Sequence, residues 1–292
     1  MQEAGYPSIL LKAIQAGFRW RHSQRGSGPL FDRIPPAPLG GEAIWSDTDV
    51  GPLMLSTSDW GARQLLLYGK YINELDETQV VSSLLPDARG IPDIGASYGW
   101  YTRLAANITP VNGMKIALEA NPAVADCLSR SLEGLPGVDV RNTAATDAAG
   151  LIAFHCALDS ALSSAAVPQR GAPVMVRGLP VDHIWPKGQP LDFVKCDVEG
   201  GELRVLRGAR GVREAEHPIW MMEFDDGVLA ESETDPSATA EEVSDLSCWW
   251  RGKDGEWSRA GNLAEVIGRP RHSNVFLVPS RRLERFATCI PL

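Results

Sequence analysis

The chain has 292 residues, which allows one large α/β domain with an extension or two small domains. Hydrophobic residues make up 44% and charged residues 22%, values that are ordinary for a soluble globular protein. The formal net charge of −9 argues against nucleic acid and anionic membranes as partners. No apolar run is long enough to span a bilayer, and the five cysteines form no CxxC pair. We therefore expect a cytoplasmic protein with reduced thiols.

The first 88 residues are predicted to form a helical extension that caps the main domain. Residues 8–20 have apolar side chains near helical spacing, so this segment is expected to pack on the main domain or on a second subunit of a homodimer. Residues 28–41 are rich in glycine and proline and predict a linker. Two more helices are expected, one capped by residues 56–59 and ending near Leu67, and one over residues 76–85.

From residue 90 onward, apolar runs alternate with helical patterns, which predicts a doubly wound, mostly parallel α/β sheet in a domain over residues 89–280. Its strands are expected to end near Asp93, Glu119, Asn142, Asp197 and Phe224. Helices are expected over residues 100–107, from Pro122, and after Gly200. Because Pro92 cannot donate a ladder hydrogen bond, the first strand is expected to be short or bent.

Other parts of this domain show weaker sequence patterns for strands and helices. A short extra strand is expected over residues 151–155, a hairpin around 253–255, and an antiparallel strand over 274–278 at the sheet edge. Within an insert over about 226–262, the acidic and Ser/Thr-rich residues 232–244 are expected to be exposed and mobile. Residues 281–292 form a C-terminal tail in this interpretation.

The stretch from Ile91 to Thr102 is predicted to form a strand end, a glycine turn and the first turn of a helix. Gly95 and Gly99 allow the backbone to turn sharply and to approach a ligand. Asp93 puts a carboxylate before the first glycine, which is unfavourable for a pyrophosphate and favourable for a cationic ligand. S-adenosylmethionine carries an ammonium and a sulfonium and no phosphate. An NAD(P)-dependent oxidoreductase would require a third loop glycine, but position 100 is Trp.

Polar residues gather at the predicted strand ends, where open α/β sheets bind their ligands. These residues are Asp93, Glu119, Asn142, Asp197 and Glu223. Four of them are acids, and carboxylates that lie close together repel one another unless a cation offsets their charge. The edge therefore predicts a site for a cationic ligand, a metal ion or both.

Three segments resemble the signature blocks of FkbM-like methyltransferases: residues 93–99, residues 119–122 and residues 195–200. They follow the order of that family, and the resemblance extends from about Trp60 to Pro279. It implies a Rossmann-like class I methyltransferase fold with S-adenosyl-L-methionine as cofactor. The contacts that the sequence and this resemblance predict for the cofactor are Asp93, Gly95, Ser97, Tyr98, Gly99, Tyr101, Thr102, Glu119, Ala120, Asn121, Asn142, Thr143, Ala144 and Asp197.

The same resemblance suggests where the acceptor binds and which groups act on it. The region before the glycine loop helps to cover the active site in this family, so Trp60, Tyr71 and Glu74 are predicted to touch substrate, together with Glu223. Asp197 lies at the strand tip nearest the transferred methyl group and is the predicted base. Further candidates for catalysis are Lys195, Glu199 and His155, although a structural Lys195–Asp197 ion pair is an open alternative.

The sequence therefore predicts an S-adenosylmethionine-dependent O-methyltransferase that acts on a hydroxyl of a sugar or of another small molecule in natural-product biosynthesis. A metal-free reaction is favoured. A divalent metal held by Asp197, Glu223 and Asp225 is the alternative, because carboxylates suit magnesium. A non-catalytic binding module with the same fold is the other alternative.

Overall fold

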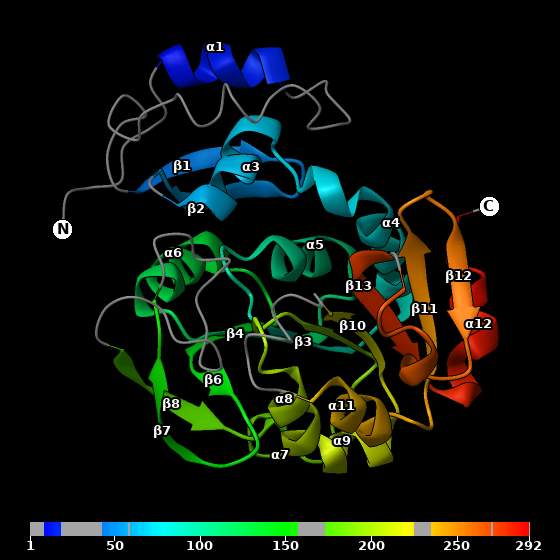
Figure 1. Cartoon of the computed structure of the whole chain (residues 1–292). Coiled ribbons are helices and arrows are strands. Elements are labelled where there is room, and N and C mark those ends of the chain that lie inside the picture. Colours follow the sequence, from blue (N-terminus) through cyan, green and yellow to red (C-terminus); the bar gives the residue numbers. More distant parts are fainter. Residues whose placement is uncertain are drawn as a thin grey trace.

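The computed structural model describes residues 9–18, 43–57, 59–156, 173–224, 235–269 and 271–291. The predicted linker over residues 28–41 lies outside these ranges. An eight-stranded sheet forms the centre of the molecule (Figure 1), in the order β12-β11-β13-β10-β9-β3-β4-β5. Its strands are β3 (Gly90–Ile94), β4 (Met114–Glu119), β5 (Val138–Asn142), β9 (Phe193–Cys196), β10 (Ile219–Glu223), β11 (Ser247–Gly252), β12 (Trp257–Ala260) and β13 (Arg271–Val278).

The predicted doubly wound sheet is confirmed. Strands β10, β9, β3, β4 and β5 pair in parallel, and β13, β11 and β12 join antiparallel. The predicted late antiparallel edge of the sheet is confirmed, although β13 is not its outermost strand. Strand β13 lies between β10 and β11, because the β11–β12 hairpin pairs on its outer side.

The effect of Pro92 is visible in the pairing of β3. This strand pairs with β4 over its whole length, but its ladder with β9 begins only at Asp93 and Ile94. Proline lacks the N–H that a further ladder bond would need. The strand is therefore paired for only a short distance on the β9 side, at the end that faces the site.

Helices cover both faces of the sheet (Figure 1), and two buried clusters divide the core accordingly. One face carries α4 (Leu75–Leu84), α5 (Trp100–Ile108), α6 (Pro122–Leu132) and α12 (Leu283–Ala287). The other face carries α7 (Val181–Ile184), α8 (Glu202–Gly208), α9 (Arg210–Glu216) and α11 (Pro236–Glu242). The start of α6 agrees with the sequence, because Asn121 caps it through Ala123 N and Pro122 follows.

The N-terminal extension lies over the α5–α6 face. It contains α1 (Ile9–Phe18), β1 (Ala43–Thr48), β2 (Gly51–Ser56), α3 (Trp60–Tyr68) and the short 3₁₀ helix η2 (Ile72–Glu74). The predicted helices α3 and α4 are confirmed, and Asp59 caps α3 by accepting from Gly61 N at 2.9 Å. The β1–β2 hairpin was not predicted. It packs on α6, where Ser131 Oγ accepts from Met54 N at 2.8 Å.

A second sheet lies beside the carboxyl ends of β4 and β5, in the order β6-β8-β7. Its strands are β6 (Ala144–Ala145), β7 (Gly150–Phe154) and β8 (Val174–Leu179). Strand β7 is the extra strand expected over residues 151–155. It turns Phe154 inward to a small buried cluster with Ala144 and Val176.

The expectation of a segment exposed throughout is wrong for residues 235–244, which contain a helix with one buried side and one exposed side. Asp235 caps α11 by accepting from Ser237 N at 2.9 Å, and Pro236 takes the first helical position. Thr239 and Ala240 are buried against the rest of the domain. Asp235 followed by Pro236 is an N-cap signal that predicts this helix, but the acidic composition of the segment favoured an exposed loop.

Three short 3₁₀ helices complete the described elements: η3 (Leu85–Asp87), η5 (Leu263–Glu265) and η6 (Ser280–Arg282). Among the described residues, none of the five cysteines forms a disulfide, and only Cys156 is exposed. None of the helices in the described residues has the length and apolar character that a bilayer span requires.

Candidate active site

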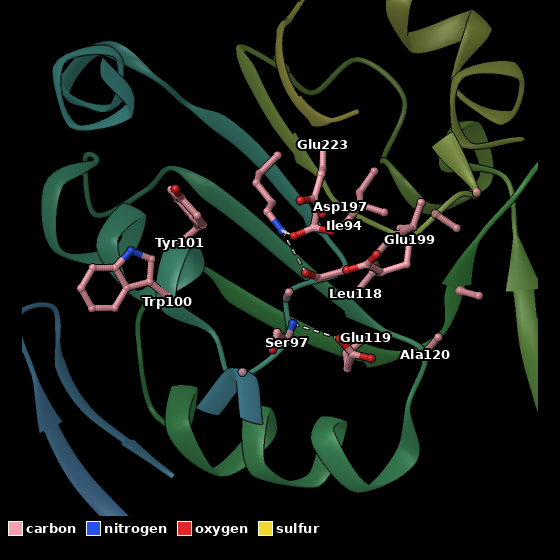
Figure 2. A pocket seen from close by; sticks show the side chains of 18 of the residues that line it. Ile94, Ser97, Trp100, Tyr101, Leu118, Glu119, Ala120, Asp197, Glu199 and Glu223 are labelled. Atoms are coloured by element: carbon pink, nitrogen blue, oxygen red, sulfur yellow. Dashed lines mark hydrogen bonds and ion pairs between the residues drawn. The ribbon is translucent and has the colours of Figure 1, made fainter. Parts of the chain in front are cut away.

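A cavity opens where the carboxyl ends of β3, β4, β9 and β10 meet the N-terminal extension (Figure 2). It brings together most of the residues that the sequence predicts for the site. These are Gly95, Ser97, Tyr101, Glu119, Ala120, Thr143, Ala144, Lys195, Asp197, Glu199, Tyr71, Glu74 and Glu223. The three sequence blocks thus converge on one cavity, because successive parallel strands end at the same edge of the sheet.

The glycine loop after β3, residues 95–99, has an unusual backbone. Gly95, Ser97 and Gly99 all have positive φ values, of 72°, 50° and 92°. A Cβ at Gly95 would lie 1.7 Å from the Asp197 carbonyl oxygen, and one at Gly99 would lie 2.8 Å from Leu128 Cδ1. Gly95 is therefore required by close approach to the Asp197 backbone, and Gly99 by its positive φ. The sequence interpretation expected the sharp turn, but it expected the close approach to be to a ligand.

Glu119 ends β4 and faces the cavity (Figure 2). Its two carboxylate oxygens accept backbone N–H bonds, from Ser97 at 2.9 Å and from Asn121 at 2.8 Å. Burial raises the pKa of this carboxyl to about 7, although the two backbone donors oppose the shift. Each oxygen keeps a second lone pair, so the carboxylate can also accept hydroxyl groups of a ligand.

Lys195 and Asp197 form an ion pair in the cavity, with 2.9 Å between Lys195 Nζ and Asp197 Oδ2. Burial alone would lower the pKa of Lys195, but the carboxylates of Asp197 and Asp93 outweigh burial and raise it. Burial alone would raise the pKa of Asp197, but Lys195 and hydrogen bonds from Lys195 and Glu223 hold it below its ordinary value. Lys195 is thus a fixed ammonium ion, and Asp197 is an ionised carboxylate.

Glu223 lies beside Asp197 at the end of β10 (Figure 2). Burial, and then the neighbouring carboxylate of Asp197, raise the pKa of Glu223 well above its ordinary value. Two carboxyl groups share a hydrogen bond only when one of them carries a proton. The pair therefore consists of ionised Asp197 and protonated Glu223.

The extension supplies the opposite wall of the cavity. Glu74 Oε2 accepts from the Tyr101 hydroxyl at 2.7 Å, and the Tyr71 ring packs edge-to-face on Trp100 at 5.7 Å between ring centroids. Burial raises the pKa of Glu74, although the Tyr101 hydrogen bond and Lys195 oppose the shift. This wall combines aromatic faces with hydrogen-bonding groups.

Several predicted residues are not part of the cavity lining. Asp93 is buried below it, where its Oδ2 accepts from Thr102 Oγ1 at 2.5 Å. Tyr98 turns away toward the extension. The others that do not line the cavity among the described residues are Gly99, Thr102, Asn121, Asn142 and His155. The side chain of Trp60 and all of Asp225 lie outside the described residues.

Other lining residues were missed by the sequence interpretation. They include Gln64, Asn73, Trp100, Ile152, Phe154 and Arg204. The position of Trp100 beside the loop was a usable signal, because the first helical turn after such a loop faces the ligand. Ile152 and Phe154 reach the cavity only because the second sheet folds over the end of β4, and no local pattern predicts that arrangement.

Three acids could hold a metal ion. Oxygen atoms of Asp197, Glu199 and Glu223 lie within 4.8 Å of one another. Glu199 is the third acid of this group, and Asp225, which the sequence interpretation named, lies outside the described residues. Lys195 already supplies a positive charge to Asp197, which weakens the need for a second cation there.

A comparison with protein families identifies a family that has this glycine loop and these acidic strand ends. The profile of the methyltransferase FkbM domain matches residues 93–243, just over half of the chain. The chain belongs to the FkbM methyltransferase family. The predicted family and fold class are thereby confirmed. The matched region runs from Asp93 at the glycine loop to Val243 after α11.

The FkbM methyltransferase from Methylobacillus flagellatus KT is one similar solved structure, with 16% identity and a TM-score of 0.43 over 65% of this chain. This chain spans 44% of that protein, which is less than half its length. An O-methyltransferase from Bacillus cereus in complex with SAH has 16% identity and a TM-score of 0.40 over 70% of this chain and 80% of its own. The O-methyltransferase TomG from Streptomyces achromogenes, in complex with SAM, has 14% identity and a TM-score of 0.39 over 81% of this chain and 92% of its own. No curated protein matches this chain.

Proposed function

We propose that the protein transfers a methyl group from S-adenosylmethionine to a hydroxyl of a small molecule, such as a sugar or a natural-product scaffold. The observation that carries this proposal is the cavity in which Ser97, Glu119 and Asp197, one from each family block, face the same space. Membership of the FkbM methyltransferase family supports the same reaction class. We also propose that the extension over residues 1–88 acts as the cap of the acceptor site.

The residues of the cavity fit S-adenosylmethionine. Glu119 offers oxygen acceptors to the two ribose hydroxyls. Ile152, Phe154 and Ala144 provide an apolar surface for the flat adenine ring. The acids on the remaining wall suit a ligand with an ammonium and a sulfonium group. When bound, this cofactor supplies the methyl group together with its own leaving group.

The task of the protein is to align the acceptor and to remove its proton. We assign proton removal to Asp197, because it is ionised and lies at the carboxyl end of β9. Lys195 is unsuited to this task, because a lysine side chain accepts a proton only as a neutral amine and the raised pKa of Lys195 keeps it protonated. Its ammonium instead holds the Asp197 carboxylate in position through the 2.9 Å ion pair.

Titration calorimetry with S-adenosylhomocysteine and with NAD tests the cofactor. We expect S-adenosylhomocysteine to bind with micromolar affinity and NAD to show no binding. Binding of NAD alone would overturn the proposal. Turnover with a set of hydroxylated acceptors then separates a methyltransferase from a module that only binds the cofactor, because a binding module retains affinity and transfers nothing.

A metal-assisted reaction is a second candidate, since the Asp197, Glu199 and Glu223 oxygens lie close enough to share one cation. We favour the metal-free reaction, because Lys195 already neutralises Asp197. Activity measured after treatment with EDTA and exhaustive dialysis decides between the two. Full activity supports the metal-free proposal, whereas a loss that magnesium restores would favour the metal-assisted reaction.

A further inference from the structure

Tyr98 is the residue of the glycine loop that the proposed reaction leaves unused. Its side chain is 2% exposed and does not line the cavity among the described residues. Its hydroxyl donates to Asp59 Oδ2 at 2.5 Å. Asp59 is also buried, and its other oxygen accepts from Gly61 N at the start of α3. A single carboxylate thus joins the glycine loop to the first turn of a helix in the extension.

The neighbours of Tyr98 contact the extension as well. The side chain of Ser97 hydrogen-bonds with Tyr71, and Trp100 packs edge-to-face on the same tyrosine. The Tyr101 hydroxyl donates to Glu74 at 2.7 Å. The residues of the extension that line the cavity form what we call the acceptor wall: Gly61, Gln64, Tyr71, Asn73 and Glu74.

The other side of the loop faces the cofactor region (Figure 2). Ser97 N donates to Glu119 Oε2 at 2.9 Å, and Gly95 and Ala96 line the cavity beside it. The loop therefore lies between the cofactor region and the acceptor wall. A ligand that favours one conformation of the loop also favours one conformation of the extension residues that the loop contacts.

We propose that Tyr98 and Asp59 are positioning residues that couple the cofactor to the acceptor wall, so that the cofactor binds first and the acceptor second. This inference rests on the proposed function. Bound cofactor stabilises the loop conformation in which Tyr98 reaches Asp59, and that hydrogen bond fixes the start of α3. The wall residues Gly61 and Gln64, on the first two turns of α3, then take the positions that the acceptor requires.

Hydrogen–deuterium exchange with S-adenosylhomocysteine tests the coupling without any knowledge of the acceptor. In the wild-type protein we expect the ligand to slow amide exchange over residues 60–74 by a factor of about five or more. In the Tyr98→Phe variant, which keeps the ring, we expect the same slowing to fall below about twofold. Its affinity for S-adenosylhomocysteine should stay within about threefold of the wild-type value, because the hydroxyl does not face the cavity.

Ser131→Ala is the matched control. It removes the hydrogen bond from Met54 N that joins the extension to α6, and it does not touch the glycine loop. The ligand should still slow exchange over residues 60–74 in this variant. Asp59→Asn keeps one oxygen for the helix cap, and its NH2 group can donate to the Tyr98 hydroxyl oxygen, so it should also retain the slowing.

With an acceptor that the protein methylates, Tyr98→Phe should raise the KM for the acceptor by about tenfold. It should leave the KM for S-adenosylmethionine unchanged when the acceptor is far below saturation. A purely structural role would lower the amount of active protein and leave both KM values as they are. Unchanged slowing of exchange in Tyr98→Phe, or none in the wild type despite tight binding, would overturn the coupling alone. Failure of S-adenosylhomocysteine to bind the wild-type protein would overturn the proposed function instead.

Discussion

The ammonium of Lys195 lies 2.9 Å from the carboxylate of Asp197, and the two residues stand at alternate positions at the end of β9. The Lys195 side chain is only 8% exposed, and that of Asp197 is 29% exposed. A buried charge is stable only with a partner, so each residue fixes the ionisation of the other. The pair that the sequence left open as a structural alternative also keeps Asp197 ionised, as its proposed role in proton removal requires.

The first prediction concerns Asp197. The Asp197→Asn variant should lose a factor of about 10² to 10⁴ in kcat, because its amide cannot take the acceptor proton. Its affinity for S-adenosylhomocysteine should change little, as measured by titration calorimetry. Glu199→Gln is the comparison, since Glu199 lines the same cavity. An equal or larger loss of kcat in Glu199→Gln would move the base to that residue.

Much of the fold follows from the sequence, because each central element has a local signal. Asn121 followed by Pro122 predicts the start of α6, and the apolar runs predict the parallel strands. The β1–β2 hairpin has no comparable signal. Its turn depends on Gly51 at a φ of 116°, and its packing on α6 is a contact between segments far apart in the sequence.

The sequence predicts which segments form the site, but not the direction of every side chain in it. Strand alternation predicts that the three blocks meet at one edge, and the cavity confirms that convergence. The direction of Tyr98 could not be predicted, because it depends on Ser97 at a φ of 50°, a conformation that the sequence signals only for glycine. Asp93 was expected at the ligand, but its side chain lies on the α5 side, where Thr102 donates to it.

The second prediction concerns the pH dependence of cofactor binding. In the proposed complex, the ribose hydroxyls donate to the ionised form of Glu119, whose pKa burial raises to about 7 in the free protein. Binding therefore favours loss of the proton, and affinity for S-adenosylhomocysteine should rise from pH 5.5 and level off above the pKa. Glu119→Gln should weaken binding by about 10- to 100-fold. Its affinity should also be nearly independent of pH, and a retained slope would assign the titration to another group.

The third prediction separates backbone strain from close contact. Gly95 and Gly188 have similar φ values, of 72° and 77°, but only Gly95 has atoms of the chain where a Cβ would be. Gly188→Ala should cost about 1 kcal/mol in the free energy of unfolding, from strain alone. Gly95→Ala should cost more than about 3 kcal/mol, because the new methyl overlaps the Asp197 carbonyl. Urea denaturation measures both, and equal losses would contradict the packing explanation.

The last prediction concerns Glu77 on α4, which is 1% exposed and has no hydrogen-bond partner for either carboxyl oxygen among the described residues. Burial raises its pKa to about 7 from an unfolded value of 4.5, so the folded state holds a proton that the unfolded state releases between these two values. The stability from this group is complete below pH 4.5 and is lost as the pH rises through the folded pKa. The loss amounts to about 3 kcal/mol for a shift of this size.

Glu77→Gln should therefore match the wild type near pH 5 and exceed it in stability near pH 8, because the amide carries no charge at either pH. Thermal melts across this range measure the difference. Glu133→Gln makes the same change at an exposed carboxyl and serves as the control. Equal pH slopes for the wild type and Glu77→Gln would mean that water or a partner outside the described residues reaches the Glu77 carboxyl.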